Sequence, residues 1–200
     1  SDINGSCIKN KKNIWTDLKL SIVIVSYNVK NYLKQCIKSI YKSSKDLKLE
    51  IIVVDNNSYD DSLLMLSNNF NDVKIISNNQ NLGFSKAVNI GIKAAKGNFI
   101  CILNPDTLIE KNTFDKLINY VLTNSQVGLI GPKILNFDGT LQKSCKRSFP
   151  TPLVALPKIL GLSKVFPSNR FFGKYNLTFL DENNIHEVDA ISGSFMLLPK

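Results

Sequence analysis

Histidine and clustered cysteine are scarce in this 200-residue sequence. His186 is its one histidine, and its four cysteines are widely spaced without a Cys-x-x-Cys pair. A histidine-based metal cluster, a zinc frame and a disulfide framework are therefore excluded. Cys36 and Cys101 lie within apolar patterns, so we expect buried thiols in a reducing compartment, with the cytoplasm as the default location.

Long apolar runs and several phosphate-binding motifs are also missing. No stretch approaches the roughly 18 apolar residues of a membrane-spanning helix. Residues 1–18 lack the apolar segment of a signal peptide, and we expect them to be an N-terminal extension or an expression remnant. Gly-x-Gly-x-x-Gly after the first strand, Gly-x4-Gly-Lys-Ser/Thr and Gly-x-Ser-x-Gly are absent. Rossmann dinucleotide, P-loop and nucleophile-elbow interpretations thereby lose their basis.

Acidic residues are scarce in one part of the chain. The net charge is +9, and residues 139–180 contain no Asp or Glu. Such a segment suits nucleic acid, anionic lipid or a phosphorylated substrate, or is simply a solvated face. Nucleic-acid binding would interleave basic residues with exposed aromatics, whereas these cluster in the Pro-rich segment 143–174, so we expect no nucleic-acid partner. The basic residues are Lys143, Lys146, Arg147, Lys158, Lys164, Arg170 and Lys174.

The sequence does contain a regular alternation of strand and helix patterns. This alternation predicts βαβ units and a largely parallel sheet that is covered on both faces. We expect Gly97 to end the third helix in the C′ position and "FDGT" (137–140) to form a turn. The expected strands are 20–28, 49–58, 73–78, 99–103, 127–130 and 188–199, and the expected helices are 29–43, about 58–70 with Ser58 or Asp60 as its cap, 84–95 and 113–123.

Three of the buried strands end in polar residues, namely Asn28, Asp55 and Asp106. Ligands of parallel sheets bind outside the carboxyl ends of the strands. Taken alone, Asp106 in "NPDT" (104–107) is equally a common turn residue. Together the three residues fit a nucleoside diphosphate, because a divalent cation can join a carboxylate to a phosphate. Instead of binding a cation, Asp55 could accept a hydrogen bond from a base or sugar.

Four segments carry a family resemblance. "SIVIVSYN", "EIIVVDNNSYDDS", "NNQNLGFSKAVNIGIKAAKGNFICILNPDT" and "VDAISGSFMLL" resemble glycosyltransferase family 2 of the GT-A fold, in the family's order and spacing over about residues 20–198. Within the family the sequence is most similar to the rhamnosyltransferase-like branch. The resemblance implies a GT-A-type, Rossmann-like α/β sandwich with a mostly parallel central sheet, truncated in its C-terminal part. It divides the chain into a nucleotide-sugar-binding half, 19–131, and the start of an acceptor-binding half, 132–200.

The resemblance also implies a donor-nucleotide site. Residues 26–28 would line the nucleobase pocket, Asp55 would hydrogen-bond the base, and residues 83–89 would close over the nucleotide. Asn104-Pro105-Asp106 occupies the family's Asp-x-Asp position, so Asp106 would hold Mg²⁺ or Mn²⁺ on the diphosphate. The residues assigned in this way are Ser26, Tyr27, Asn28, Asp55, Asn57, Ser58, Gly83, Phe84, Asn89, Asn104 and Asp106.

Two departures from the family pattern bear on catalysis. Asn104 replaces the first Asp, as it does in this branch, so one carboxylate carries the metal. The family's general base lies in an acidic Glu-Asp motif after the last matched strand, and the sequence contains no such motif. Asp189 is a weak candidate whose expected role is structural, or contact with the acceptor or donor sugar. We assign no catalytic base and expect this chain to bind donor but to transfer little sugar.

The expected function is sugar transfer from a dTDP- or UDP-sugar to a hydroxyl of a glycan or glycolipid, with inversion, in cell-wall or polysaccharide biosynthesis. A sugar-1-phosphate nucleotidyltransferase is the enzyme alternative. It would need a Gly-rich, basic loop after the first strand to receive a triphosphate, and "SYNVKNY" offers none. A basic nucleic-acid-binding module is the non-enzymatic alternative.

The segment "LVALPKILGLSKVF" (153–166) combines apolar residues with two lysines. A helix broken near Pro157 and lying flat on an anionic membrane, with Lys158 and Lys164 toward the headgroups, would use this composition. The alternative is that these apolar residues cover the sheet edge. A peripheral membrane contact is therefore one expectation, and a lipid-linked acceptor would suit it.

Overall fold

The computed structural model describes residues 18–44, 47–166 and 168–200. The expected N-terminal extension and Cys7 therefore lie almost wholly outside the described residues. The chain divides into two compact units, one reaching to Ile130 and including Gly193–Lys200, and the other formed by Gly131–Ser192. The final eight residues thus belong with the first unit, and acceptor binding by residues 132–200 stays a prediction.

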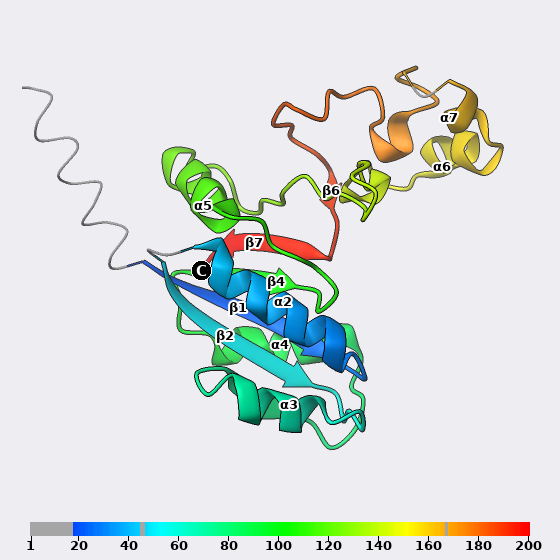
Figure 1. The fold of residues 1–200 in the computed structure, drawn as a ribbon. Helices are drawn as coiled ribbons and strands as arrows, with labels where there is room; N and C mark the ends of the chain where they lie inside the picture. The colour runs from blue at the N-terminus through cyan, green and yellow to red at the C-terminus, as the bar shows by residue number, and fades with distance from the viewer. Residues whose placement is uncertain (1–17, 45–46, 167) are drawn as a thin grey trace, which may run out of the picture. The chain divides into compact units, whose positions relative to one another are not determined.

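The first unit contains a five-stranded sheet in the order β3-β2-β1-β4-β7 (Figure 1). The first four strands run parallel, and β7 pairs antiparallel with β4 at the edge. The expected α/β fold with a mostly parallel sheet is therefore confirmed. The bounds are β1 (Lys19–Ser26), β2 (Lys48–Asp55), β3 (Lys74–Ser77), β4 (Phe99–Leu103) and β7 (Phe195–Pro199).

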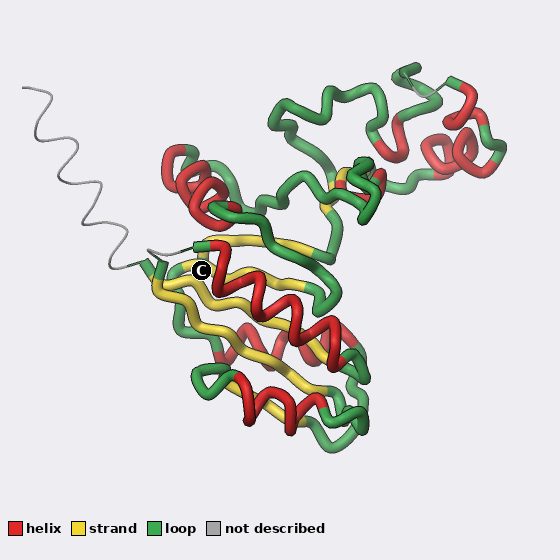
Figure 2. The backbone as a smooth tube through the Cα atoms, viewed as in Figure 1, coloured by secondary structure: helices red, strands yellow, loops and turns green. Residues whose placement is uncertain are grey.

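Helices cover both faces of this sheet, which is why its central strands are apolar on both sides. Val23 and Ile52 point to one face and pack with Ala87 of α4. On the opposite face lies α2, which buries Leu33 and Ile37, and Figures 1 and 2 show the strands between these two helices. The helix bounds are α2 (Lys30–Ser43), α3 (Ser62–Asn69), α4 (Phe84–Ala94) and α5 (Thr113–Thr123).

The second unit is built from short elements. Its two-stranded antiparallel sheet joins β5 (Lys146–Arg147) to β6 (Ala190–Ile191). The helix α6 (Pro152–Ile159) packs with α7 (Leu162–Val165) and with the 3₁₀ turn η2 (Lys174–Asn176). A further 3₁₀ turn, η1 (Lys143–Cys145), precedes β5. No helix within the described ranges is long and apolar enough to cross a membrane.

Several expected element boundaries need correction. The expected strand at 127–130 is only an isolated bridge between Ile130 and Leu197. The expected last strand splits at its Gly-Ser interruption, so that β6 and β7 belong to different sheets. The turn at 137–140 is confirmed, with Gly139 at φ +81°.

The C′ role expected for Gly97 is wrong, and the reason for glycine there is different. α4 ends in extended backbone at Ala95, and Gly97 is not among the glycines with positive φ. A Cβ on Gly97 would lie 2.7 Å from the backbone oxygen of Lys19 and 2.7 Å from the nitrogen of Ser21. Close approach of backbone to backbone therefore requires glycine at this position.

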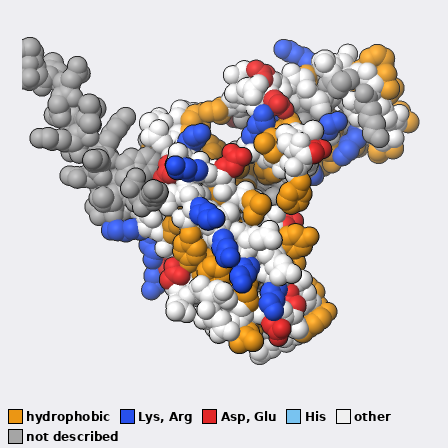
Figure 3. All heavy atoms as spheres, in the orientation of Figure 1, with side chains coloured by type: hydrophobic (Ala, Val, Ile, Leu, Met, Phe, Trp, Pro, Cys, Tyr) orange, Lys and Arg blue, Asp and Glu red, His pale blue; other side chains and the backbone are white. Residues whose placement is uncertain are grey.

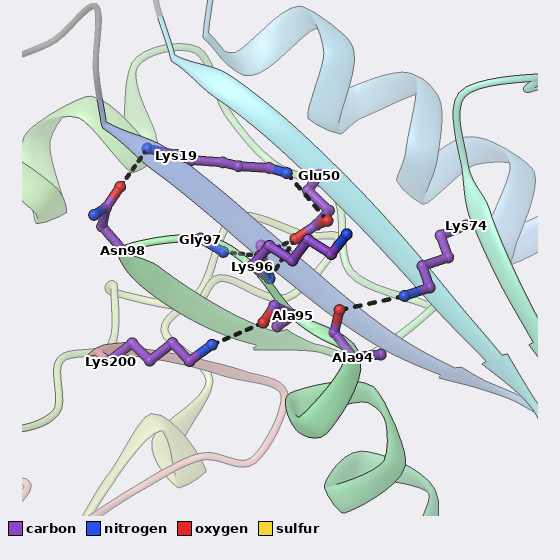
Figure 4. A network of polar contacts seen from close by, with 10 residues as sticks. Lys19, Glu50, Lys74, Ala94, Ala95, Lys96, Gly97, Asn98 and Lys200 are labelled. Carbon is purple, nitrogen blue, oxygen red and sulfur yellow. Dashed lines mark hydrogen bonds and ion pairs between the residues drawn. The ribbon is translucent and has the colours of Figure 1, made fainter.

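A polar network ties the amino-terminal ends of the strands together (Figure 4). Glu50 is its centre: its carboxylate accepts hydrogen bonds from Ser21 Oγ, from Lys96 N at 2.7 Å and from Lys19 Nζ at 3.1 Å. Ser21 Oγ in turn accepts the Gly97 N–H at 2.8 Å. The network lies at the strand ends opposite the polar residues of the expected site, and its role is structural.

We expect Glu50 to make stability depend on acid pH. Burial opposes its charge, but the hydrogen bonds from Ser21, Lys96 and Lys19 outweigh burial and lower the pKa of Glu50 below its ordinary 4.5. A lowered folded-state pKa adds stability that is present above pH 4.5 and is lost as the pH falls through the folded value. Thermal unfolding between pH 7 and pH 3 should therefore show a steeper acid loss in the wild type than in Glu50→Gln. Equal slopes would contradict this role.

Candidate functional site

The carboxyl ends of β1, β2 and β4 lie next to one another at one edge of the sheet. Ser26 ends β1 and pairs in register with Asp55, which ends β2. On the other side of β1, Leu103 ends β4 and pairs with Ile24. The sheet thus brings the polar residues that follow these strands to a common edge, which is where parallel sheets bind ligands.

Asp55 is fully buried and is held by the loop that follows it. Its Oδ1 accepts the Ser58 hydroxyl at 2.6 Å, and its Oδ2 accepts the Ser58 N–H at 2.8 Å. A carboxylate has about four acceptor positions, so each oxygen keeps a free lone pair. Asp55 is therefore both an anchor for its own loop and a fixed acceptor.

The loops after β1 and β2 are joined by reciprocal hydrogen bonds. The Asn28 N–H donates to Ser58 Oγ at 3.0 Å, and Asn28 Oδ1 accepts the Tyr59 N–H at 2.9 Å. Asp60 accepts the Lys30 N–H at 2.8 Å, at the start of α2. Asn28 has φ +54°, a left-handed conformation that asparagine tolerates better than most residues. These contacts hold the loops after β1 and β2 together, and we call these two loops, residues 27–29 and 56–61, the rim.

Two tyrosines stand on this rim. Tyr27 and Tyr59 lie edge to face with ring centroids 6.3 Å apart, and both rings are exposed. A hydrogen bond with Tyr59 raises the pKa of the Tyr27 phenol. Exposed, mutually supported aromatic faces beside a buried acceptor suit a flat heterocycle.

Ser26, the last residue of β1, has a hydroxyl group that is available for a hydrogen bond. Its Oγ is buried and has no hydrogen-bond partner among the described residues. A buried polar atom left unpaired costs roughly 1–3 kcal/mol. A ligand atom that paired with this hydroxyl would remove that cost.

The loop before α4 is tied to the same region. The Asn56 Nδ2 donates to the Gly83 carbonyl at 3.3 Å, while Asn78 Nδ2 donates to Asn56 Oδ1 at 2.9 Å. Gly83 has φ +76° and open space where a Cβ would stand. Phe84 and Asn89 are exposed, and no hydrogen bond among the described residues joins them to the rim. Closure of this loop over a nucleotide stays a prediction.

Asp106 follows β4 and carries a free carboxylate. It is exposed, and it makes no hydrogen bond or ion pair with any residue that the structure describes. The preceding Asn104 is half-buried, and its N–H donates to the Ser194 carbonyl at 2.9 Å. Burial, and then the charge of Asp106, raise the pKa of the Cys36 thiol to about 12, so Cys36 is an inert core group.

Asp189 belongs to the second unit, where two neighbouring groups donate hydrogen bonds to its carboxylate. Its Oδ2 accepts the Ser148 hydroxyl at 2.7 Å and the Phe149 N–H at 3.2 Å. These hydrogen bonds lower the pKa of Asp189. A carboxylate with a lowered pKa is a weak general base.

Sequence reasoning missed three residues that build the rim. Asn56 links the β2 loop to Gly83, Asp60 links it to α2, and Tyr59 supports Tyr27. All three lie inside "DNNSYDDS", a segment that was already expected to contribute to the site. Their partners, however, come from segments about 30 residues away. No local pattern in the sequence indicates those partners.

The fold and this edge together define an α/β domain with polar side chains gathered at the carboxyl ends of its parallel strands. The model of the family described as Glycosyl transferase family 2 matches residues 21–192, so the chain belongs to this family. The resemblance in the sequence is thereby confirmed at the level of the family, a family of enzymes.

Individual relatives agree with this assignment. The chain is 30% identical over 125 residues to glycosyltransferase GlyG of Streptococcus pneumoniae, which is 60% of this chain and 40% of that protein. It is 26% identical over 177 residues to the poly(ribitol-phosphate) beta-N-acetylglucosaminyltransferase TarS of Staphylococcus aureus, which is 84% of this chain and 29% of TarS. The chain therefore spans less than half the length of these relatives.

Solved structures support the fold. A crystal structure of S. aureus TarS 1–349 in complex with UDP-GlcNAc superposes with a TM-score of 0.56 at 24% identity, over 66% of this chain and 39% of that one. The mannosyltransferase PcManGT of Pyrobaculum calidifontis, in complex with GDP-Man and Mn²⁺, gives a TM-score of 0.53 at 17% identity over 66% and 43% of the two chains. The expected GT-A-type architecture is thus confirmed.

Proposed function

We propose that this domain binds a nucleoside diphosphate sugar, with UDP or dTDP as the nucleotide, and serves its transfer to a hydroxyl of an acceptor with inversion. The observation that carries the proposal is the common sheet edge, where the buried Asp55 ends β2 and the free Asp106 follows β4, the two strands on either side of β1. The complexes of TarS with UDP-GlcNAc and of PcManGT with GDP-Man support a nucleotide-sugar donor.

The nucleobase would lie against the rim of the β1 and β2 loops. Tyr27 would stack on the ring, with Tyr59 supporting its edge. Asp55 keeps acceptor positions that fit an imide N–H of uracil or thymine, and the Ser26 hydroxyl is available for a further hydrogen bond. Asn57, Ser58, Gly83, Phe84 and Asn89 would complete the donor site.

A divalent cation fits the other end of the site. Asp106 offers an unpaired, exposed carboxylate, and Asn104 precedes it by two residues. Mg²⁺ typically takes one or two protein carboxylates and completes its shell with phosphate oxygens and water. No group of three or more His, Cys, Asp or Glu residues in the described part could hold a metal alone, so the diphosphate would have to contribute ligands. A bound Mg²⁺ or Mn²⁺ would neutralise charge on the leaving diphosphate.

The acceptor would be a glycan or a lipid-linked glycan, in the synthesis of cell wall or polysaccharide. The similarity to TarS, named for a poly(ribitol-phosphate) acceptor, supports this class. A sugar of the rhamnose type stays a proposal from the branch resemblance. We place the enzyme in the cytoplasm, with peripheral contact to the inner face of an anionic membrane. Because Asp189 is occupied by Ser148 and Phe149, it is not assigned as the base.

A thermal-shift panel tests the proposed ligand class. UDP, dTDP, GDP and ADP are each added with Mn²⁺ and with EDTA, and the melting temperature is recorded. A ligand at a hundredfold excess over its Kd stabilises by about 2.7 kcal/mol, which is about 5–10 °C in a domain of this size. We expect UDP or dTDP to reach this shift with Mn²⁺. Absence of any nucleotide effect with either additive would refute the proposal.

A further inference from the structure

The second unit exposes an unusual number of large apolar side chains on its short helices. Leu153, Ile159 and Leu160 are 73%, 78% and 63% exposed, and Leu156 is 51% exposed. In a helix of 3.6 residues per turn, positions 153, 156 and 160 form one stripe, and Ile159 flanks it. The helix α6 therefore turns an apolar face outward.

The inward side of α6 is accounted for by other residues. Val154 and Pro157 are buried, and Lys158 lies over the Tyr175 ring with its Nζ 3.7 Å from the ring centroid. This cation–π contact holds α6 to η2. Lys158 is exposed and lies on the side of the helix away from the exposed stripe, so its expected position toward lipid headgroups stays a prediction. The Lys164 side chain lies outside the described residues.

The chain bends after α6, which extends the apolar face into a second segment. The expected break of the helix near Pro157 is wrong. The helix α6 continues to Ile159, and the bend comes at Gly161, with φ +75°. Beyond it Val165, Phe166 and Phe171 are 67%, 50% and 60% exposed. Phe172 contacts the rings of both Phe166 and Phe171, with centroids 5.7 and 5.5 Å away. We call the exposed side chains of Leu153, Leu156, Ile159, Leu160, Val165, Phe166 and Phe171 the α6–α7 face.

Only positive charges accompany this face in the sequence. Residues 139–180 contain no Asp or Glu, so the segment itself carries no group that repels an anion. Asp189 of the same unit accepts hydrogen bonds from Ser148 and Phe149 and interacts with Lys174. Arg147 and Arg170 are exposed and have no ion-pair partner among the described residues, and Lys174 is exposed as well. Figure 3 shows hydrophobic side chains at the outer edge of the part that holds α6 and α7, with basic and also some acidic side chains nearby.

We propose that the α6–α7 face is a membrane-docking surface that inserts its apolar side chains into a bilayer containing anionic lipid. Apolar residues on short helices flanked by cations are the chemistry of interfacial helices, which enter about 5–10 Å into the headgroup region. Each basic residue near an anionic surface strengthens binding by about 1 kcal/mol, or about fivefold. Membrane docking through this face rests on the proposed location of the enzyme at a membrane. It requires neither donor binding nor sugar transfer, so its test is independent of the proposed nucleotide site.

Vesicle co-sedimentation tests the proposal with the 200-residue chain. Vesicles of phosphatidylglycerol and phosphatidylcholine are compared with pure phosphatidylcholine, at low and at high salt. We expect binding only with phosphatidylglycerol and a loss of that binding at high salt. Leu156→Glu/Ile159→Glu should weaken binding at least tenfold, because both side chains would no longer insert. Arg170→Glu should weaken it at least fivefold.

Matched substitutions on the first unit serve as controls. Leu64 on α3 is 58% exposed, so Leu64→Glu places a charge on an exposed apolar position of the first unit. Lys38 on α2 is exposed, and Lys38→Glu matches the charge reversal of Arg170→Glu. Both should leave vesicle binding unchanged, and unchanged melting temperatures should show that all variants fold. No binding to anionic vesicles, or equal loss in the control variants, would overturn the proposal. Dimerisation in light scattering that Leu156→Glu/Ile159→Glu abolishes, without lipid binding, would reassign the face to a second copy of the chain.

Discussion

Asp106→Ala should abolish the metal-dependent part of nucleotide binding while leaving the fold intact. Asp106 is exposed and unpartnered among the described residues, so its removal breaks no contact. Surface changes of this kind usually alter stability by less than about 0.5 kcal/mol. In the proposed site, however, Asp106 is the one carboxylate assigned to the cation. Of the shift of about 5–10 °C expected for UDP or dTDP with Mn²⁺ at a hundredfold excess over Kd, we therefore expect the part that depends on Mn²⁺ to disappear.

Two further variants make this result specific. Asp106→Asn keeps the size of the side chain and removes its charge, so it should behave like Asp106→Ala if the carboxylate binds the cation. Glu110→Ala removes an exposed carboxylate four residues later and should keep the full shift. An undiminished metal effect in Asp106→Ala would reduce Asp106 to a turn residue, which is the alternative that the sequence left open.

Gly97→Ala should destabilise the first unit strongly. The added Cβ would lie 2.7–2.8 Å from three backbone atoms, those of Lys19 O, Ser21 N and Phe99 O. These atoms belong to the central strands β1 and β4, so the contact cannot be relieved by rotating a side chain. Overpacking of a rigid site costs about 1–3 kcal/mol and sometimes more. We expect about 3 kcal/mol, or a fall of about 6–12 °C in the melting temperature.

Gly128→Ala is the matched control for this substitution. Gly128 is exposed, and nothing lies within 4 Å of a Cβ built on it. Its replacement should change the melting temperature by little. If Gly97→Ala proved as mild as Gly128→Ala, the close approach between the α4–β4 connection and the two strands would be contradicted.

Local sequence patterns were sufficient to predict the central elements. β4 and α5 have the expected bounds, because an apolar run ends at Asn104-Pro105 and a helical period begins at Thr113. The strands 20–28 and 49–58 were expected to be longer. Left-handed backbone at Asn28 and Asn57 ends regular strand geometry near these residues, and a sequence pattern does not reveal that conformation.

Long-range contacts were beyond such reasoning. The edge position of β7 beside β4 and the partners of Asn56 and Asp60 depend on segments brought together by the fold. The role of Lys158 is of the same kind, since its partner Tyr175 follows 17 residues later, in the short 3₁₀ turn η2. Charge and apolarity were readable from the sequence, whereas the direction in which each side chain points required the structure.

The central claim is that nucleotide and cation bind at the edge formed by β1, β2 and β4. A crystal structure of this chain with Mn²⁺ and whichever of UDP or dTDP gives the larger thermal shift tests it most directly. We predict an anomalous manganese peak bridging the Asp106 carboxylate and the diphosphate, with the base against Tyr27 and hydrogen-bonded to Asp55. Nucleotide bound instead in the pocket of the second unit, beside Lys143 and Lys146, or manganese bound away from Asp106, would contradict the account.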